Sequence, residues 1–386
     1  MLTRNINFKN FKKKINTKKI KNSLKKLLKE KNEIIKSLGP TYRNTYNDEI
    51  IKKYQKFKDI NIIGIGGATL GTESIYKFLK HKIKKNLIFF DNLNPNSIIT
   101  KKKEGALNLI VSKSGNTIET ISNVNIILNK NKNHNIFITG NKKSYLLTLA
   151  EKLKAEIVHH NDFIGGRYSV LSEVGMLPAE LMGLNKNNFK QINNLIKNKK
   201  FVNSLILNVS NLIYFLNTKK LNSIILNYDE KSFALFQWYQ QLMSESLGKN
   251  GVGFLPTIST MPKDNHSLMQ LYLDGPKNNF FTFFSVKEKK SNNIINDQIL
   301  ASHNYLKNKN IYKIMVAQKC ATENVFKKKN IPFRSFEILN RSEKSLGELF
   351  CFFILETILL GRALKINPYN QPSVELIKKE TKKILI

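Results

Sequence analysis

Short apolar runs alternate with longer amphipathic stretches along most of the chain, beginning near residue 60. Five of these runs predict β-strands in the first half, at residues 60–65, 87–90, 107–111, 136–139 and 157–159. The stretches between them are long enough to form crossover helices. Strands that alternate with helices in this way favour a parallel, doubly wound sheet.

The same alternation restarts near residue 190. It predicts strands at 223–227, 280–286, 311–316 and 333–338, a long helix at 346–364 and a short helix at 374–384. We therefore expect two α/β/α sandwich domains in series, residues 56–190 and 191–386, each with a parallel sheet. Before them, residues 1–55 place Ile20, Leu24, Leu27 and Ile34 at the spacing of an amphipathic helix with a lysine-rich outer face, which predicts a basic helical segment.

Charge is the most unusual feature of the composition. The 386 residues include 64 Lys and Arg against 28 Asp and Glu, a formal net charge of +36. Such a charge suggests nucleic-acid binding, but the lysines are spread along the chain and no recognition-helix motif accompanies them. Lys, Asn and Ile are frequent together and share A/T-rich codons, which points to genome composition. We expect no nucleic-acid partner and infer attraction of small anions; a basic nucleic-acid-binding protein is the most distant alternative.

Three other features bear on the cellular location of the protein and on whether it has a membrane partner. The only cysteines, Cys320 and Cys351, have no metal-type spacing and form no disulfide framework, which favours a reducing, cytoplasmic location. The longest apolar run, residues 349–355, is much shorter than the roughly 18 residues of a membrane helix. The N-terminal sequence lacks the apolar stretch of a secretory signal. We therefore expect no membrane partner.

A cluster of hydroxyl side chains follows the third predicted strand. Ser112, Lys113, Ser114 and Thr117 surround Gly115 and lead into an apolar, helical stretch. Hydroxyls and backbone N–H groups at a helix N-terminus form a cradle for an anion, because the helix end carries partial positive charge. A helix cap with a glycine turn is the simpler interpretation, but a cap needs one hydroxyl rather than three. We predict a phosphate-binding loop.

A glycine-rich loop, residues 64–68, ends the first predicted strand. The dinucleotide-binding spacing G-x-G-x-x-G fails because its third position is Thr69, and the chain has no P-loop motif. Gly66 and Gly67 nevertheless allow a sugar or phosphate to approach the backbone closely.

Three ionisable residues stand beside sharp turns. Glu245 lies in the last turn of a predicted helix, a position suited to a general base, although a surface glutamate fits equally well. His266 is expected in the first turn of a helix that ends at Gly275, where a neutral ring can exchange a proton with a sugar oxygen; a lone histidine is more often structural. Arg167 follows a diglycine and can stabilise developing negative charge, or form an ordinary ion pair.

These stretches occur together and in one order. They are GIGG at 64–67, SKSGNTIET at 112–120, GGRYS at 165–169, SESLGK at 244–249, HSLMQLYLDGP at 266–276 and QPSVELIK at 371–378. The series resembles the glucose-6-phosphate isomerase (phosphoglucose isomerase) family from about residue 60 to residue 378. Any one of the motifs would be a weak signal, whereas six collinear matches are a strong one.

The resemblance implies a role for each matching residue. Glu245 would be the base that moves a proton between C1 and C2 of the sugar through a cis-enediol(ate), and Arg167 would stabilise that intermediate. His266 would be the ring-opening acid and base, assisted by Lys378. The substrate-binding positions implied are Gly66, Gly67, Ser112, Lys113, Ser114, Thr117 and Gln371. No metal and no other cofactor is implied, and no His/Cys/Asp cluster suggests one.

The resemblance also implies an architecture and an assembly. Members have two sugar-isomerase (SIS) domains of flavodoxin-like α/β/α type per subunit and form dimers, with the histidine reaching the neighbouring subunit's site. We therefore expect reversible interconversion of glucose 6-phosphate and fructose 6-phosphate, in glycolysis and gluconeogenesis, by a homodimer in which His266 acts in trans. Two alternatives are a relaxed isomerase that also accepts mannose 6-phosphate and a non-catalytic SIS-domain regulator that binds sugar phosphates.

Overall fold

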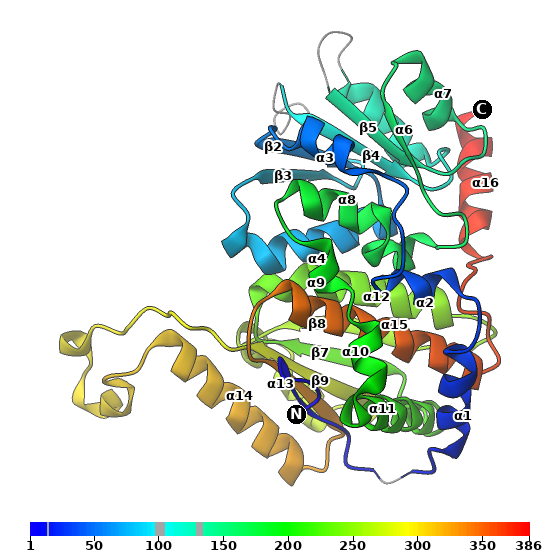
Figure 1. Ribbon diagram of the computed structural model, residues 1–386. Helices are drawn as coiled ribbons and strands as arrows, with labels where there is room; N and C mark the ends of the chain where they lie inside the picture. The colour runs from blue at the N-terminus through cyan, green and yellow to red at the C-terminus, as the bar shows by residue number, and fades with distance from the viewer. Residues whose placement is uncertain (14, 97–104, 129–133) are drawn as a thin grey trace.

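Two five-stranded sheets form the framework of the protein (Figure 1). The structure is a computed structural model and describes residues 1–13, 15–96, 105–128 and 134–386. The first sheet has the order β3-β2-β4-β5-β6, and every pair in it is parallel. Its strands are β2 (Asp59–Ile63), β3 (Asn86–Phe90), β4 (Leu107–Ser112), β5 (His134–Thr139) and β6 (Glu156–His159). All five strands predicted for this half of the chain are confirmed.

The second sheet has the order β1-β10-β9-β7-β8. Four strands are parallel, namely β7 (Asn222–Asn227), β8 (Leu255–Thr260), β9 (Asn279–Val286) and β10 (Phe333–Ile338). The fifth, β1 (Ile6–Lys9), pairs antiparallel with β10, so the expectation of a wholly parallel sheet is wrong at this edge. Residues 1–55 are likewise not purely helical. The Phe8 ring, 4.4 Å from the Phe336 ring, helps to hold this short strand in place.

One predicted strand is a helix. Residues 311–316, predicted as a strand, begin α14 (Ile311–Lys328). The run contains apolar residues at positions 311, 314 and 315, a spacing that suits a helix as well as a short strand. The Asn310 side chain accepts a hydrogen bond from the Lys313 backbone N–H at 2.9 Å, and this N-cap favours the helix. Strand β8, by contrast, was not predicted.

Helices fill the space between and around the sheets (Figure 1). They include α1 (Lys18–Leu27), α2 (Glu33–Ser37), α3 (Asp48–Tyr54), α4 (Leu70–Leu79), α6 (Ile118–Ile127), α7 (Tyr145–Lys152), α8 (Glu173–Leu181), α9 (Lys186–Phe189), α10 (Ile192–Lys197), α11 (Lys199–Asn217), α12 (Phe233–Leu247), α13 (Met269–Asp274), α15 (Glu343–Ala363) and α16 (Val374–Leu385). Helices α4, α8, α12 and α15 lie between the two sheets, and residues 345–361 of α15 are all buried. The largest apolar cluster includes residues of both sheets, so the two halves share a core. The domain limits at 56–190 and 191–386 stay a prediction.

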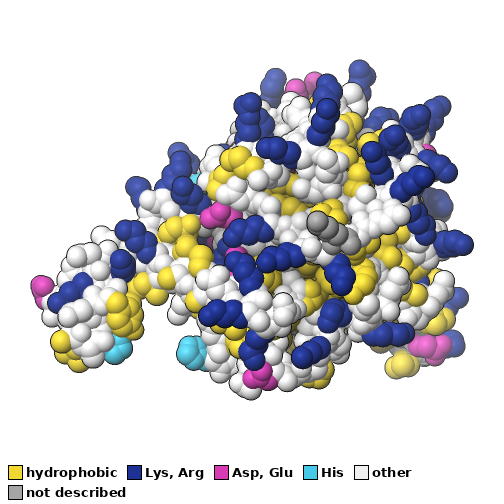
Figure 2. Space-filling view, turned by 90° about the horizontal axis from the view of Figure 1, so that it is seen from below, with side chains coloured by type: hydrophobic (Ala, Val, Ile, Leu, Met, Phe, Trp, Pro, Cys, Tyr) yellow, Lys and Arg dark blue, Asp and Glu magenta, His cyan; other side chains and the backbone are white. Residues whose placement is uncertain are grey.

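Two segments extend from this body. Residues 287–310 form an arm, which contains the 3₁₀ turns η6 (Asn296–Gln298) and η7 (Ala301–Leu306) and projects away from the sheets (Figure 1). Helix α16 follows α15 at the end of the chain, and none of its residues is buried. Within the described residues, no helix combines the length and apolar character that crossing a membrane requires. Lys and Arg are scattered over the face seen in Figure 2 rather than gathered in one patch.

Candidate functional site

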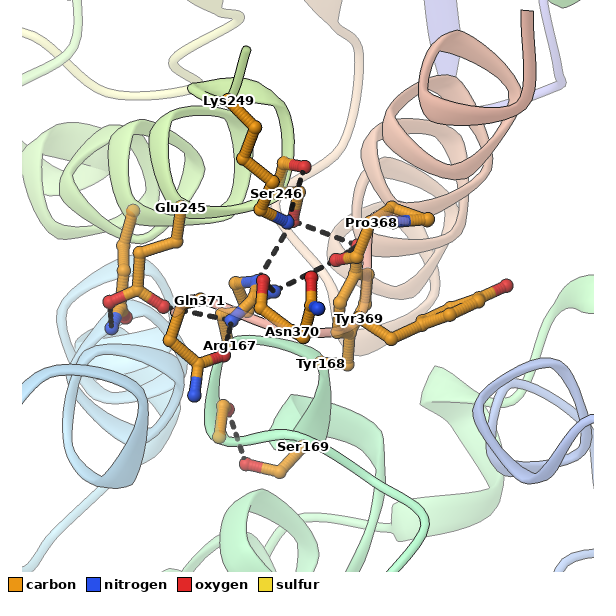
Figure 3. Close-up of polar contacts among 12 residues, drawn as sticks. Arg167, Tyr168, Ser169, Glu245, Ser246, Lys249, Pro368, Tyr369, Asn370 and Gln371 are labelled. Carbon is orange, nitrogen blue, oxygen red and sulfur yellow. Dashed lines mark hydrogen bonds and ion pairs between the residues drawn. The ribbon is translucent and has the colours of Figure 1, made fainter. Parts of the chain in front are cut away.

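Arg167 is the centre of a dense set of polar contacts (Figure 3). It lies in the 3₁₀ helix η3 (Gly166–Leu171) just beyond β6 and is 2% exposed. Its five N–H groups reach five acceptors: Ser246 Oγ at 2.8 Å, Glu245 Oε2 at 2.9 Å, Gln371 Oε1 at 2.8 Å, the Pro368 carbonyl at 2.8 Å and the Asn370 carbonyl at 3.1 Å. The guanidinium therefore joins η3 to α12 and to the segment that follows α15.

Glu245 presents its carboxylate beside this guanidinium from the last turn of α12. One oxygen, Oε2, accepts from Arg167, and the other, Oε1, accepts from the Gln241 side-chain amide at 3.1 Å. The side chain is still 30% exposed, so the carboxylate is oriented by two donors and also reachable from outside. An oriented, accessible carboxylate can remove a proton from a bound molecule.

Gln241 is a site residue that the sequence reasoning missed. It lies four positions before Glu245 on α12, so the two side chains share one face of the helix. It also borders the glycine loop (residues 64–68), because a Cβ atom at Gly66 would lie 2.8 Å from its Nε2. Gly66 has φ +59°, a conformation that favours glycine. The i, i+4 spacing from the predicted base was the signal in the sequence that could have identified Gln241.

The glycine loop packs directly against η3. A Cβ atom at Gly67 would lie 2.3 Å from the Gly166 carbonyl carbon and 2.5 Å from the Arg167 nitrogen. Gly67 is therefore needed for the close approach of the two loops, and its predicted contact with a sugar stays a prediction. On the other side of η3, the Trp238 Nε1–H donates to the Arg167 carbonyl at 3.0 Å. These contacts fix the backbone from which Arg167 extends.

The hydroxyl loop (residues 112–117) connects β4 to α6 at the carboxyl edge of the first sheet, with Thr117 at the N-cap position. Thr117 Oγ1 lies 3.2 Å from Ser112 Oγ and 3.3 Å from Ser114 Oγ, so the three predicted hydroxyls converge. Gly115, with φ +64°, makes the turn between them. Three hydroxyls at the start of a ten-residue helix can donate hydrogen bonds to a phosphate.

Lys113, predicted in the same cradle, directs its ammonium to the backbone of another loop. Its Nζ donates to the Asp162 carbonyl at 2.6 Å and to the Ile164 carbonyl at 3.1 Å. Burial lowers the pKa of this ammonium from its usual value. The side chain is thus engaged by protein acceptors, and a role in binding phosphate stays a prediction.

His266 and Lys378 are not brought to Glu245 within this chain. His266 is exposed and lies in the 3₁₀ turn η5 (Lys263–His266), not in the first turn of a helix as we expected, because α13 begins only at Met269. Lys378 is exposed on α16 and pairs with Glu375 at 2.7 Å. In the part of the chain that the structure describes, no hydrogen bond or ion pair joins either residue to Glu245 or Arg167. Gln371, in contrast, contacts Arg167 directly.

The described residues contain no group of three or more His, Cys, Asp or Glu side chains placed to hold a metal ion. The chemistry that the site offers rests on a carboxylate, a guanidinium and a separate cradle of hydroxyls. Such a set can exchange a proton with a small anionic molecule and stabilise the negative charge that develops.

Comparison with known proteins decides the family. A model of the phosphoglucose isomerase family matches residues 51–386. The glucose-6-phosphate isomerase of Methanocaldococcus jannaschii is 31% identical over 362 residues, which cover 88% of each chain. The chain belongs to the phosphoglucose isomerase family.

Solved structures agree on the fold. A hypothetical protein of Thermus thermophilus superposes with a TM-score of 0.83 at 22% identity, covering 96% of this chain and 94% of its own. A glucose-6-phosphate isomerase of Chlamydia trachomatis gives a TM-score of 0.70 at 20% identity, covering 92% of this chain and 73% of its own. The predicted α/β fold of this isomerase family, with parallel sheets, is confirmed apart from the antiparallel edge strand β1. All six motifs of the phosphoglucose isomerase resemblance lie inside the matched residues.

Proposed function

We propose that the protein interconverts glucose 6-phosphate and fructose 6-phosphate. Glu245 removes the proton from C2 of the aldose or C1 of the ketose and returns it to the other carbon, through a cis-enediol(ate). The observation that carries this proposal is the Glu245 carboxylate, held between Arg167 and Gln241 yet 30% exposed. A single base can serve both carbons because they are adjacent and the carboxylate is held in one place.

Arg167 acts mainly through its charge in this arrangement. All five of its N–H groups already have acceptors, so the guanidinium supports the carboxylate and its surroundings electrostatically. A direct hydrogen bond to an enediolate oxygen requires one acceptor to give way. Gln371 is the acceptor best suited to this exchange, because its side-chain amide can rotate, whereas the Pro368 and Asn370 acceptors are backbone carbonyls.

The hydroxyl loop binds the phosphate end of the sugar. Ser112, Ser114 and Thr117 supply hydroxyl donors, and the start of α6 adds partial positive charge. The phosphate does not react, so its binding energy serves to position C1 and C2 at Glu245. The net charge of +36 attracts the dianionic sugar phosphate at longer range, an effect that salt weakens.

His266 completes the site from a second copy of the chain in this proposal. Its exposure, and the lack of any contact with Glu245 in the described chain, support an action in trans. The homodimer has unpartnered apolar surface to use. Ile295, Leu300 and Tyr305 on the arm are 64–75% exposed, and in Figure 2 the arm stands clear of the body with apolar side chains on its surface. Lys378 lies on α16, none of whose residues is buried, and assists ring opening once that helix is packed against the site.

We further propose that the enzyme acts in glycolysis and gluconeogenesis, in the cytoplasm; the isomerase named among its relatives supports this assignment. The test is a coupled assay with fructose 6-phosphate, comparing the wild type with Glu245→Gln and with Glu230→Gln, an exposed glutamate outside the site. We expect turnover in the wild type and in Glu230→Gln, and a loss of about 10²- to 10⁴-fold in Glu245→Gln. Glutamine keeps an oxygen acceptor for Arg167, so the structure of the site should be preserved. Inorganic phosphate should therefore still bind at the hydroxyl loop and inhibit the residual activity. Equal rates in all three proteins would remove Glu245 from the mechanism.

A further inference from the structure

The arginine loop (residues 160–167) leads from the end of β6 to Arg167 and is held at its centre by a lysine from the hydroxyl loop. Lys113 Nζ donates to the carbonyls of Asp162 and Ile164, at 2.6 and 3.1 Å. Ile164 lies three residues before Arg167. Lys113 therefore ties the hydroxyl loop directly to the loop that carries Arg167.

His160 holds the same carbonyl from inside the protein. Its Nε2 lies 2.9 Å from the Ile164 oxygen, and its Nδ1 lies 2.7 Å from Glu173 Oε1. Each ring nitrogen of His160 thus lies within hydrogen-bonding distance of an oxygen. The ring is 2% exposed and Glu173 is fully buried. The Ile164 carbonyl thus lies within hydrogen-bonding distance of two side chains from separate elements, Lys113 and His160.

Glu173 is itself fixed by several donors. Its Oε1 also accepts from the Asn161 N–H at 2.8 Å, and its Oε2 accepts from the Tyr42 hydroxyl at 2.8 Å. Burial alone would raise the pKa of Glu173, but hydrogen bonds and charge from His160, with the Asn161 N–H, hold that pKa below its usual value. The carboxylate therefore anchors the start of the arginine loop, and charge-assisted hydrogen bonds of this kind are stronger than neutral ones.

We infer that Lys113 and His160 are positioning residues, which couple the hydroxyl loop to Arg167 through the shared Ile164 carbonyl. The inference rests on the proposed isomerase activity. It assigns the Lys113 side chain to the placement of Arg167 rather than to phosphate binding. A phosphate seated on the hydroxyl loop then sets the arginine loop in the geometry that Glu245 needs, so a broken link impairs the chemical step more than the binding of the anion.

Lys113→Met removes the ammonium and keeps a side chain of similar length, and Lys113 is only partly buried, so this variant is expected to fold. We expect kcat with fructose 6-phosphate to fall about 10- to 100-fold. The inhibition constant of inorganic phosphate should match that of Lys142→Met, a control that removes a neighbouring exposed lysine. Lys113→Arg, which can still donate to both carbonyls, should recover much of the lost kcat.

A weaker inhibition by phosphate with unchanged kcat in Lys113→Met would overturn the inference and make Lys113 a phosphate ligand. A double-mutant cycle adds a second test: because Lys113 and His160 share one acceptor, the kcat losses of Lys113→Met and His160→Gln should not add. Additive losses would overturn the coupling. An inactive wild type would refute the proposed isomerase activity and this inference with it, whereas an active wild type with an unimpaired Lys113→Met refutes the inference alone.

Discussion

The two ends of the proposed site differ sharply in how far one chain builds them. Around Arg167, side chains from η3 and α12 and the segment after α15 meet in buried and partly buried hydrogen bonds (Figure 3). His266 and Lys378 lie exposed, on η5 and α16, without a contact to that centre in the described chain. The difference teaches that the fold preorganises the proposed base and its cation, whereas the proposed ring-opening groups have no contact with that centre in the described chain.

The largest effect expected outside Glu245 tests the preorganised end. Arg167→Met leaves the Glu245 carboxylate without its cation and Ser246, Gln371 and two carbonyls without their donor. We expect kcat to fall about 10²- to 10³-fold. Steady-state kinetics, with Arg43→Met as a control at an exposed arginine, checks this. A normal kcat in Arg167→Met would show that the buried cluster is structural only.

The exposed end is tested by mixing two inactive variants. Glu245→Gln lacks the base and His266→Ala lacks the ring-opening group, so each homodimer is expected to have little activity with ring-closed substrate. If His266 acts in trans, half of a random mixture is heterodimer and each heterodimer has one intact site, which restores about a quarter of wild-type activity. Mixing after joint unfolding and refolding, followed by the coupled assay, measures this. No recovery in verified heterodimers would place His266 outside the neighbour's site.

A smaller effect is expected at the hydroxyl loop, which is intermediate in organisation between the Arg167 cluster and the exposed residues His266 and Lys378. Ser114→Ala removes one of the three converging hydroxyls without touching Glu245 or Arg167. We expect KM for fructose 6-phosphate to rise about 10- to 150-fold with kcat nearly unchanged, since a hydrogen bond to a charged group contributes about 1.5–3 kcal/mol. Ser122→Ala, further along α6, is the control. If kcat fell and KM stayed constant, the hydroxyl would act on the reaction rather than on phosphate binding.

The smallest effect concerns stability on the Arg167 side. Lys190 Nζ donates to the carbonyls of Ser37 and Leu171, the latter at the end of η3. Burial lowers the pKa of Lys190 to about 7, whereas an unfolded lysine titrates near roughly 10.4. Between these values the unfolded state binds more protons, so the free energy of unfolding rises with pH from about 7 to about 10. Urea unfolding at pH 7 and 9 should show this rise in the wild type and a smaller one in Lys190→Met. Equal rises would assign it to other groups.

The sequence predicted the strands of the first sheet and the convergence of the three hydroxyls, and it missed features that depend on distant parts of the chain. The strands of the first sheet are apolar runs whose type does not depend on distant partners, and Ser112, Ser114 and Thr117 converge because they follow one strand. The strand β1 depends on an edge of β10 more than 320 residues away, which a local pattern cannot reveal. The apolar residues of 311–316 fit the period of a helix as well as that of a strand, and the N-cap at Asn310 favours the helix. The contacts of the Lys113 side chain likewise depend on tertiary structure, whereas the contact of Gln241 with Glu245 is local and follows from their i, i+4 spacing.

The central claim is that one carboxylate, Glu245, moves the proton between C1 and C2. The most direct measurement follows fructose 6-phosphate in D₂O by NMR, with wild type and Glu245→Gln at equal concentration. A base that exchanges its proton with solvent puts deuterium on C2 of the aldose product and on C1 of the recovered ketose, so the wild type should label both carbons and the variant neither. Equal labelling by both proteins, or equal turnover by both, would contradict the account.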